Sequence, residues 1–295
     1  MKFFPLISQI FSVTAFVCVT ACSAQEPVIK HTKDLIYAKH DGVALTMDVL
    51  QPKKANGLGI IYIVSGGWKS THSGIGSGAP FTDRGYTVFY VVHGSQPRFI
   101  VEEIVDDIHH AVRYIRCNAK KFNINPNKLG ITGSSAGGHL SLMIATTGGF
   151  KNGAAEDAMG CTNSSVQAAA VFYPPTDYLN WSAEGDVAVG VGKLAAFSAA
   201  FGPGSLTAEG RDSLGHKLSP IYHVNSKQPP VLIIHGDADR DVPIFQAYQF
   251  QKKCKEAGVI CELQVVKGGG HGGWPDVKKQ QELLVDFFDK HLKNK

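Results

Sequence analysis

Short apolar runs alternate with longer amphipathic runs along most of the chain after residue 30. The strand-like runs cover residues 34–40, 43–52, 59–64, 85–92, 128–132, 167–174, 229–236 and 261–266. The helix-like runs cover residues 101–119, 136–147, 244–258 and 276–294. Apolar strands separated by amphipathic helices are typical of a parallel sheet that is covered on both faces. The pattern therefore predicts an α/β fold in which the first two runs form a leading antiparallel pair.

One long interval interrupts this alternation. Residues 177–228 are rich in Ala, Gly and Ser and contain a helical patch but no strand-like run. Because a long interval without strands is commonly a functional insertion, we expect a lid-like segment over the sheet. Its aromatic residues, Tyr178, Trp181 and Phe197, either line an acyl or aromatic pocket or form a small core of the lid itself. The interval does not resemble a second domain, so residues 35–295 are expected to form one domain.

The first part of the chain has the features of an export signal. A short basic start precedes an apolar stretch at residues 10–20, which is too short and too rich in Ser and Thr to span a bilayer well. The sequence "VTAC" that follows resembles the lipobox of bacterial lipoproteins, which predicts cleavage before Cys22 and acylation of its thiol. Residues 1–21 are then the signal segment and residues 22–34 a tether. The alternative is cleavage after Ala24, which yields a soluble periplasmic or secreted protein.

The charge distribution bears on the partners of the chain. There are 29 Lys and Arg against 25 Asp and Glu, a formal net charge of +4, and no basic block longer than a pair such as Lys53-Lys54. This distribution argues against a nucleic-acid partner. We expect membrane association only through the lipid anchor, and a location in the bacterial cell envelope.

Four cysteines follow Cys22, and in an oxidising compartment they can form disulfides. Cys254 lies near the end of a helix-like run and Cys261 opens the next strand-like run, so only a short loop separates them. We predict a bridge between Cys254 and Cys261, which leaves Cys117 to pair with Cys161. The alternative is four free thiols.

Two adjacent serines lie between an apolar run and a helix-like run. The pattern Gly-x-Ser-x-Gly spans Gly133 to Gly137 with Ser135 at its centre, whereas Ser134 has no glycine at either flanking position. A strand, a tight glycine turn and a helix form the setting of a nucleophile elbow. Ser135 is therefore the candidate nucleophile. The N–H of Ala136, at the positive end of the helix, is a candidate oxyanion donor.

A serine hydroxyl needs an imidazole to take its proton and a carboxylate to orient that imidazole. Three aspartates, Asp237, Asp239 and Asp241, follow the seventh strand-like run, and spacing alone does not choose between them. His271 follows the last strand-like run in a glycine-rich loop, which makes it the candidate base. His139 lies within a helix and is expected to be a buried hydrogen-bonding residue instead.

Four motifs together resemble the α/β-hydrolase superfamily: "SGGW", "GITGSSAGGHLSLMIA", "PPVLIIHGDADRDVP" and "GGGHGGW". Within it, residues 35–292 are similar to the exported esterase and lipase group, which shares motifs with hormone-sensitive-lipase-like carboxylesterases, feruloyl and acetyl esterases and the catalytic domain of prolyl oligopeptidases. The resemblance implies the α/β-hydrolase fold, with a mostly parallel sheet of about eight strands, helices on both faces and a small lid. The family motif H-G-x-x-D-x-x-V-P matches His235 to Pro243 and selects Asp239 as the acid.

The loop expected to complete the oxyanion hole departs from the family pattern. These esterases usually carry His-Gly-Gly-Gly-Trp where this chain has Val64-Ser65-Gly66-Gly67-Trp68. Adjacent glycines let backbone N–H groups point into a cavity, so Gly66 and Gly67 are the candidate donors. Ser65 stays open as an alternative donor.

These residues predict a serine carboxylic-ester hydrolase that uses neither a cofactor nor a metal. Ser135, His271 and Asp239 would act through an acyl-enzyme on a small-molecule substrate, expected to be a short-acyl or carbohydrate-linked ester. A prolyl-oligopeptidase-like exopeptidase is the second possibility, although those enzymes carry a large β-propeller for which too few residues precede Ser135. A non-catalytic binding protein on the same fold is the third, and the intact Ser, Asp and His argue against it.

Overall fold

The computed structural model of the chain describes residues 29–149 and 163–293, together with Met1. Residues 2–21 of the predicted signal segment, the candidate lipidation site Cys22 and the predicted disulfide partner Cys161 lie outside the described residues. Within the described ranges, no helix has the length and apolar character needed to cross a membrane.

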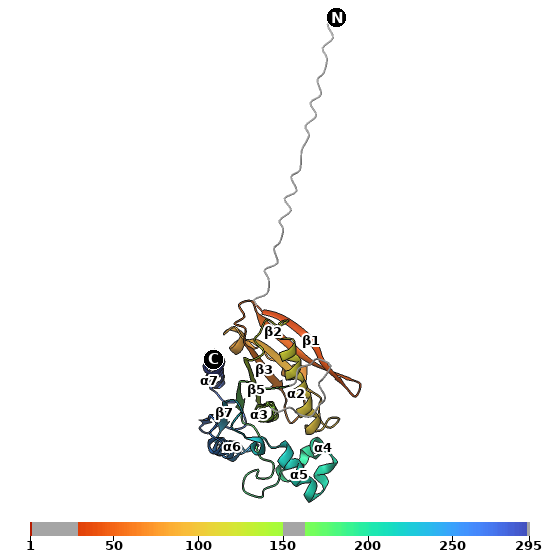
Figure 1. The fold of residues 1–295 in the computed structure, drawn as a ribbon, viewed down its shortest axis with the longest axis vertical. Helices are drawn as coiled ribbons and strands as arrows, with labels where there is room; N and C mark the ends of the chain where they lie inside the picture. Colours follow the sequence, from red (N-terminus) through yellow and green to blue (C-terminus); the bar gives the residue numbers. More distant parts are fainter. Residues whose placement is uncertain (2–28, 150–162, 294–295) are drawn as a thin grey trace.

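One eight-stranded sheet forms the centre of the domain (Figure 1). Its strands are β1 (Ile29–His40), β2 (Val43–Pro52), β3 (Gly59–Val64), β4 (Thr87–Val92), β5 (Leu129–Ser134), β6 (Ala168–Phe172), β7 (Val231–Gly236) and β8 (Cys261–Val266). Their order is β1-β2-β4-β3-β5-β6-β7-β8, with β1–β2 and β2–β4 antiparallel and the remaining pairs parallel. The predicted mostly parallel sheet with a leading antiparallel pair is confirmed. Because β3 to β8 run in the same direction, the loops after these strands meet at one edge.

The first strand begins earlier than the sequence pattern indicates. β1 starts at Ile29, which pairs with Pro52 of β2, so residues 29–34 belong to the sheet and not to a tether. This part of β1 is polar, lies at the sheet edge and contains a register shift between Thr32 and Leu35. Polar residues and bulges are common on edge strands, and they remove the apolar alternation that would have revealed the strand.

Helices cover both faces of the sheet, as predicted. They are α1 (Ala79–Thr82), α2 (Val101–Cys117), α3 (Ala136–Thr147), α4 (Ser198–Phe201), α5 (Ala208–Leu218), α6 (Phe245–Glu256) and α7 (Val277–Phe288). α2, α3 and α6 share a core with Ile61 and Ile131, whereas α1 and α7 share a core with Ile60 and Leu232. Ile60 and Ile61 belong to different cores because successive side chains of a strand point to opposite faces.

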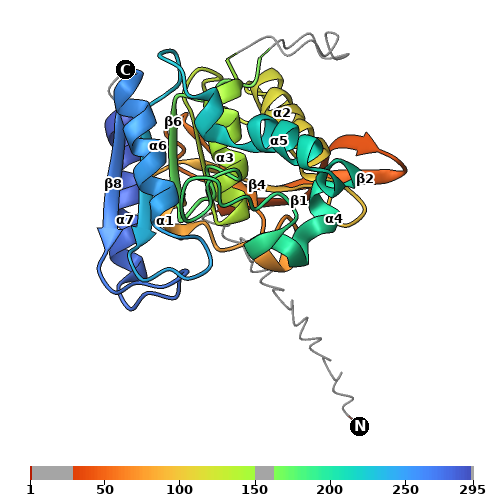
Figure 2. The same cartoon turned by 90° about the horizontal axis from the view of Figure 1, so that it is seen from below.

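The segment between β6 and β7 is the predicted insertion. It contains α4, α5 and three short 3₁₀ turns, and none of its residues, all of which are described, forms a strand. Figure 2 shows α4 and α5 on the side of the sheet that carries α2 and α3, and the segment contacts both of these helices. The side-chain NH₂ of Gln246 on α6 donates to the carbonyls of Asp177, Asn180 and Trp181. The insertion is therefore packed onto the helices α2, α3 and α6 that cover the sheet.

The predicted bridge between Cys254 and Cys261 is wrong. Both are free thiols, although their side chains lie in hydrogen-bond contact. Their closeness in sequence does bring the sulfurs together, but the formation of a bond is an oxidation that spacing does not decide. Cys117 is disulfide-bonded, and its predicted partner Cys161 lies outside the described residues.

Candidate active site

Ser135 occupies a sharp turn between β5 and α3. Its backbone dihedrals, φ 52° and ψ −121°, are strained for a residue with a side chain. Flanking glycines are required because a Cβ on Gly133 would lie 2.5 Å from the carbonyl of Gly137, and one on Gly137 would lie 2.6 Å from the carbonyl oxygen of Ile63. The turn therefore has the close backbone approaches that a nucleophile elbow needs, and it presents Ser135 at the carboxyl edge of the sheet.

The two adjacent serines have different partners. The Oγ of Ser135 lies 2.9 Å from the Nε2 of His271. The Ser134 hydroxyl instead forms a hydrogen bond with Tyr173. The structure thus brings only one of the two hydroxyls, that of Ser135, to the histidine that the sequence singles out.

Asp239 lies on the other side of the His271 ring. The Nδ1 of His271 donates to Asp239 Oδ2 at 2.7 Å, and the Asp239 side chain is fully buried. The Oδ1 atom accepts the backbone N–H groups of Asp241 and Val242 at 2.9 and 3.0 Å. Burial by itself would raise the pKa of Asp239, but hydrogen bonds from His235, His271 and the Val242 N–H outweigh it and hold that pKa well below its usual range. The carboxylate is therefore ionised and fixed in place beside the imidazole.

The other two aspartates of the same loop have different surroundings. Asp237 Oδ1 accepts the backbone N–H of Gly268 at 2.6 Å and so ties the β7 loop to the loop that carries His271. Asp241 is exposed, and its carboxylate lies 3.5 Å from the ammonium group of Lys193. Neither contacts the imidazole, so Asp239 is the carboxylate in the hydrogen-bonded series, as the family motif indicates.

The expected oxyanion donors differ in their availability. The N–H of Gly66 donates to the carbonyl of Lys69 at 2.9 Å, so this candidate is already used within its own loop. Among the described residues, no acceptor pairs with the N–H of Gly67, whose φ is 53°, or with that of Ala136 at the first position of α3. Ser65 contributes a buried hydroxyl that has no hydrogen-bond partner in the described part of the chain. Gly67 and Ala136 therefore have free N–H groups, as does the alternative donor Ser65, whose N–H also has no acceptor among the described residues.

Tyr173 is a residue at this edge that the sequence interpretation missed. It directly follows β6 and has a φ of 36°, and its ring centroid lies 4.5 Å from that of His271. Its hydroxyl contacts Ser134, so the side chain bridges the nucleophile turn and the histidine loop. Positive φ values in non-glycine residues also occur at Trp68 and Ser135, which follow β3 and β5. Such strain is common at functional sites, but no sequence signal marks a tyrosine that adopts it.

The insertion packs against the candidate oxyanion loop through aromatic rings. Trp68 is buried, and its ring lies 5.7 Å from that of Phe197 and 6.1 Å from that of Tyr178, centroid to centroid. Tyr178 and Trp181 are fully or almost fully buried, and both belong to the core that α2 and α3 form with the sheet. Phe197 is partly exposed, and a Cβ on Gly67 would lie 2.6 Å from its ring. Of Tyr178, Trp181 and Phe197, only Phe197 is both partly exposed and next to Gly67, so it is the one that can line a pocket at the candidate site.

His139 is the buried, hydrogen-bonded residue that the sequence predicts. Its Nε2 donates to the carbonyl of Leu218 at 2.7 Å, and its Nδ1 accepts the Trp68 indole N–H at 3.4 Å. Burial lowers the pKa of His139 to about 4, so the ring is neutral at physiological pH. It joins α3, the candidate oxyanion loop and the insertion.

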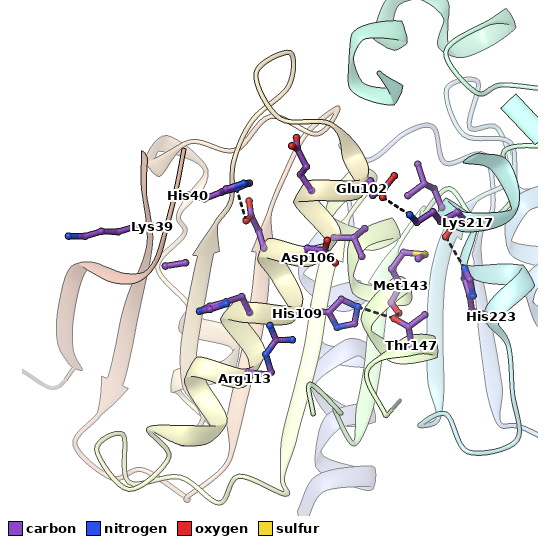
Figure 3. Close-up of a pocket in the computed structure, with 16 residues that line it drawn as sticks. Lys39, His40, Glu102, Asp106, His109, Arg113, Met143, Thr147, Lys217 and His223 are labelled. Carbon is purple, nitrogen blue, oxygen red and sulfur yellow. Dashed lines mark hydrogen bonds and ion pairs between the residues drawn. The ribbon is translucent and has the colours of Figure 1, made fainter. Parts of the chain in front are cut away.

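A separate cavity of about 830 Å³ lies between β1, α2, α3 and α5 (Figure 3). In this view His109 points from α2 toward Thr147, with 3.1 Å between the ring Nε2 and the hydroxyl, and Lys217 pairs with Glu102. Ser135, Asp239 and His271 are not among its lining residues. Two groups of side chains in the described ranges could hold a metal ion, and neither includes these three residues.

The fold and the hydrogen-bonded serine, histidine and aspartate define the class of this protein, which is an α/β-hydrolase. The BD-FAE family model matches residues 47–254, more than half of the chain. The chain therefore belongs to the BD-FAE family.

Similar proteins carry esterase names. The acetylxylan esterase of Xylanibacter ruminicola is 26% identical over 261 residues, which cover 82% of this chain and 47% of that protein. Esterase LipQ of Mycobacterium tuberculosis is 26% identical over 174 residues, which cover 59% of this chain and 39% of LipQ. A truncated carbohydrate esterase from gut microbiota has a similar structure, with a TM-score of 0.77 and 27% identity over 92% of this chain and 99% of that one. The chain thus spans less than half the length of the two sequence relatives.

Proposed function

We propose that the chain is a serine carboxylic-ester hydrolase with Ser135 as nucleophile. The observation that carries this proposal is the continuous series of hydrogen bonds from Ser135 through His271 to Asp239, with distances of 2.9 and 2.7 Å. Membership of the BD-FAE family and the esterase names of the relatives support the same reaction class. In a hydrogen-bonded series of this kind, the imidazole takes the proton of the serine hydroxyl and passes it to the leaving alcohol.

The proposed steps follow from which atoms face one another. Asp239 accepts the Nδ1–H of His271, so the lone pair of Nε2 faces the Ser135 hydroxyl. The Ser135 oxygen attacks the ester carbonyl carbon while Nε2 takes its proton. The tetrahedral intermediate expels the alcohol, which receives that proton, and leaves an acyl-serine. Water then attacks the acyl group by the same route and releases the acid and the free enzyme.

Backbone N–H groups would stabilise the negative oxygen of each tetrahedral intermediate. We assign this role to Gly67 and Ala136, whose N–H groups have no acceptor among the described residues. Ala136 is the first residue of α3, where the helix dipole favours negative charge. Tyr173 is proposed as a positioning residue, because it packs on the His271 ring and bonds to Ser134 without contacting the Ser135 hydroxyl.

The proposed substrate is a short-acyl ester, including esters on carbohydrates. The Phe197 ring packs against the loop at Gly67. When the carbonyl oxygen of an ester binds the Gly67 N–H, this ring would limit the length of the acyl chain that fits. Two relatives support a carbohydrate alcohol by their names, acetylxylan esterase and carbohydrate esterase. Replacement of Phe197 by Ala should therefore raise kcat/KM for hexanoyl relative to acetyl p-nitrophenyl esters by at least roughly tenfold, the lower end of the effect of one methylene in a hydrophobic pocket. An unchanged ratio would remove Phe197 from the acyl site.

Two linked measurements test the function itself. Hydrolysis of p-nitrophenyl esters and acetylated xylan should fall by on the order of 10⁴ to 10⁶ in kcat for Ser135→Ala. Ser134→Ala is the matched control and should lose at most about tenfold, because its hydroxyl only bonds Tyr173. A fluorophosphonate probe should label the wild type and the Ser134 variant but not the Ser135 variant. Labelling that survives Ser135→Ala would refute the assignment of Ser135 as nucleophile. Faster cleavage of aminoacyl anilides than of acetyl esters would favour a prolyl-oligopeptidase-like exopeptidase over an esterase.

We also propose that the mature protein is exported and lipid-anchored through Cys22. The support comes from the sequence, in which an apolar stretch at residues 10–20 leads into "VTAC".

A further inference from the structure

A cluster of carboxylates and imidazoles lies at the β1–β2 edge of the sheet. Asp34 comes from β1, Asp48 from β2 and His72 from the short 3₁₀ turn His72–Gly74 between β3 and β4. One donor atom from each of these residues lies within 4.8 Å of the others. His31, also on β1, places its Nε2 2.6 Å from Asp48 Oδ2. The cluster contains none of the residues of the proposed reaction.

The backbone of β1 is distorted in a way that places Asp34 in the cluster. The register between β1 and β2 shifts between Thr32 and Leu35, and Asp34 has a φ of 52°. A non-glycine residue in this region of φ persists only where its surroundings hold it. Here the Asp34 N–H donates to Asp48 Oδ1 at 2.9 Å, and the Asp34 carboxylate lies 2.9 Å from His72 Nε2. The bulge therefore gathers two carboxylates and two imidazoles from three segments of the chain.

In the part of the chain that the structure describes, the two carboxylates have no permanently charged partner. Within residues 29–149 and 163–293, Asp34 contacts the imidazole of His72 and Asp48 that of His31, and neither carboxylate forms an ion pair with a lysine or arginine. Carboxylates this close repel one another, and Asp48 is buried, so water screens the repulsion poorly. A divalent cation at the meeting point would neutralise both carboxylates.

We propose that Asp34, Asp48 and His72 bind Zn²⁺, and that His31 is the hydrogen-bond partner that orients Asp48. One imidazole nitrogen with two carboxylate oxygens is a donor set that suits zinc, which completes a tetrahedron with water where three protein groups bind it. A hydrogen bond to a ligating carboxylate, such as that from His31, is a usual support of a metal site. Calcium requires six or more oxygen ligands, which this group does not offer.

The exposed ligands can adjust to the ion. Zinc at this point would replace the direct contact between His72 Nε2 and Asp34 Oδ1. Tetrahedral bonds of about 2.0–2.1 Å separate donor atoms by about 3.3 Å. The present 2.9 Å contact between His72 and Asp34 would thus open by about 0.4 Å. The side chains of His72 and Asp34 are 51% and 67% exposed, so this movement and the entry of the ion leave the core intact. Because His72 lies in the same β3–β4 connection as Gly67, the ion would fasten that connection to the sheet edge.

Binding of Zn²⁺ to the full chain, first freed of metal with EDTA, tests the proposal. Calorimetry and elemental analysis after dialysis should show one tightly bound zinc per chain, with Ca²⁺ bound at least about tenfold more weakly. Asp34→Asn and His72→Gln should each weaken zinc binding by at least about tenfold. His216→Gln is the matched control, because His216 is also exposed but lies near a single carboxylate, Asp212, at 3.6 Å. Saturating zinc should raise the Tm of the wild type and the control by about 5 °C, and not that of the other two variants.

Three results would overturn the site: no stoichiometric zinc on the wild type, zinc affinity unchanged in both Asp34→Asn and His72→Gln, or Ca²⁺ bound as tightly as Zn²⁺. Circular dichroism of the metal-free variants separates loss of binding from loss of fold. If either variant does not fold, the spectrum of Co²⁺ on the wild type decides. Nitrogen and oxygen ligation without a thiolate charge-transfer band supports the site, and a thiolate band places the ion at Cys254 and Cys261 instead.

Discussion

Replacing Asp239 with Asn should stop the proposed reaction without disturbing the fold. In the structure, Oδ1 accepts the N–H groups of Asp241 and Val242, and Oδ2 accepts the Nδ1–H of His271. The amide oxygen of the variant must take the Oδ1 position, because an NH₂ group there would face two N–H donors. The NH₂ group then faces Nδ1 of His271, which can only accept its hydrogen bond. The ring proton moves to Nε2, and Nε2 can no longer take the proton of Ser135.

The magnitude follows from this change of tautomer. In a Ser-His-Asp series, loss of the histidine tautomer with its proton on Nδ1 lowers kcat by about 10⁴, which is about 5.4 kcal/mol of transition-state stabilisation. KM should change by less than about threefold, because Asp239 lies behind the imidazole and is fully buried. Initial rates on p-nitrophenyl acetate over a range of substrate concentrations separate the two constants.

Asp241→Asn is the control for this experiment. The Asp241 side chain is exposed, and only its backbone N–H takes part in the network, so its kcat should stay within about twofold of wild type. The reasoning is refuted if folded Asp239→Asn keeps more than about a tenth of the wild-type kcat, or if Asp241→Asn falls as far. A Tm measured on both variants shows whether each is folded.

Three further outcomes are expected. Tyr173→Phe keeps the ring against the histidine and should lower kcat by less than about tenfold, whereas Tyr173→Ala should lower it about 100-fold with little change in KM; equal effects would contradict a positioning role for the ring. Burial lowers the pKa values of His93, His109 and His139 from 6.5 to about 4. As the pH falls, these histidines are protonated in the unfolded chain before they are protonated in the folded protein. The stability that they contribute above pH 6.5 should therefore be lost as the pH falls toward 4. Thermal unfolding at pH 7, 5.5 and 4.5 measures this loss, and a constant Tm would oppose it. Cys22→Ser should move the protein from the membrane to the soluble fraction, and a wild-type protein that is already soluble would exclude the anchor.

The candidate carboxylate shows how sequence and structure contribute differently. Spacing left Asp237, Asp239 and Asp241 equivalent, and only resemblance to a family motif selected Asp239. In the structure, Asp237 accepts a backbone N–H of the loop that carries His271, and Asp239 accepts a hydrogen bond from His271 itself. The Asp241 side chain is exposed. The choice depends on a contact with a residue 32 positions away. No local pattern contains that information.

Gly66 and the pair Cys254 and Cys261 show the same difference between what residue types predict and what the structure decides. A glycine pair marks a loop that can present N–H groups, but the carbonyl of Lys69 takes the N–H of Gly66 and leaves that of Gly67 free. Likewise, the short loop between Cys254 and Cys261 does bring the thiols into contact, yet they are not bonded. Residue types therefore predict which groups can take part, and three-dimensional geometry decides which of them do.

Local patterns in the sequence are enough to locate the eight strands, the four long helices outside the insertion and the turn at Ser135, because each depends on a short apolar run, on helical periodicity or on a motif a few residues long. They did not reveal the first residues of β1, whose polar edge lacks such a pattern. Only the tertiary structure placed Tyr173 against His271, and only it gathered Asp34, Asp48 and His72 from three segments. These meetings depend on how distant elements pack, since the order of strands and the direction of each loop decide which side chains lie within a few ångströms of one another.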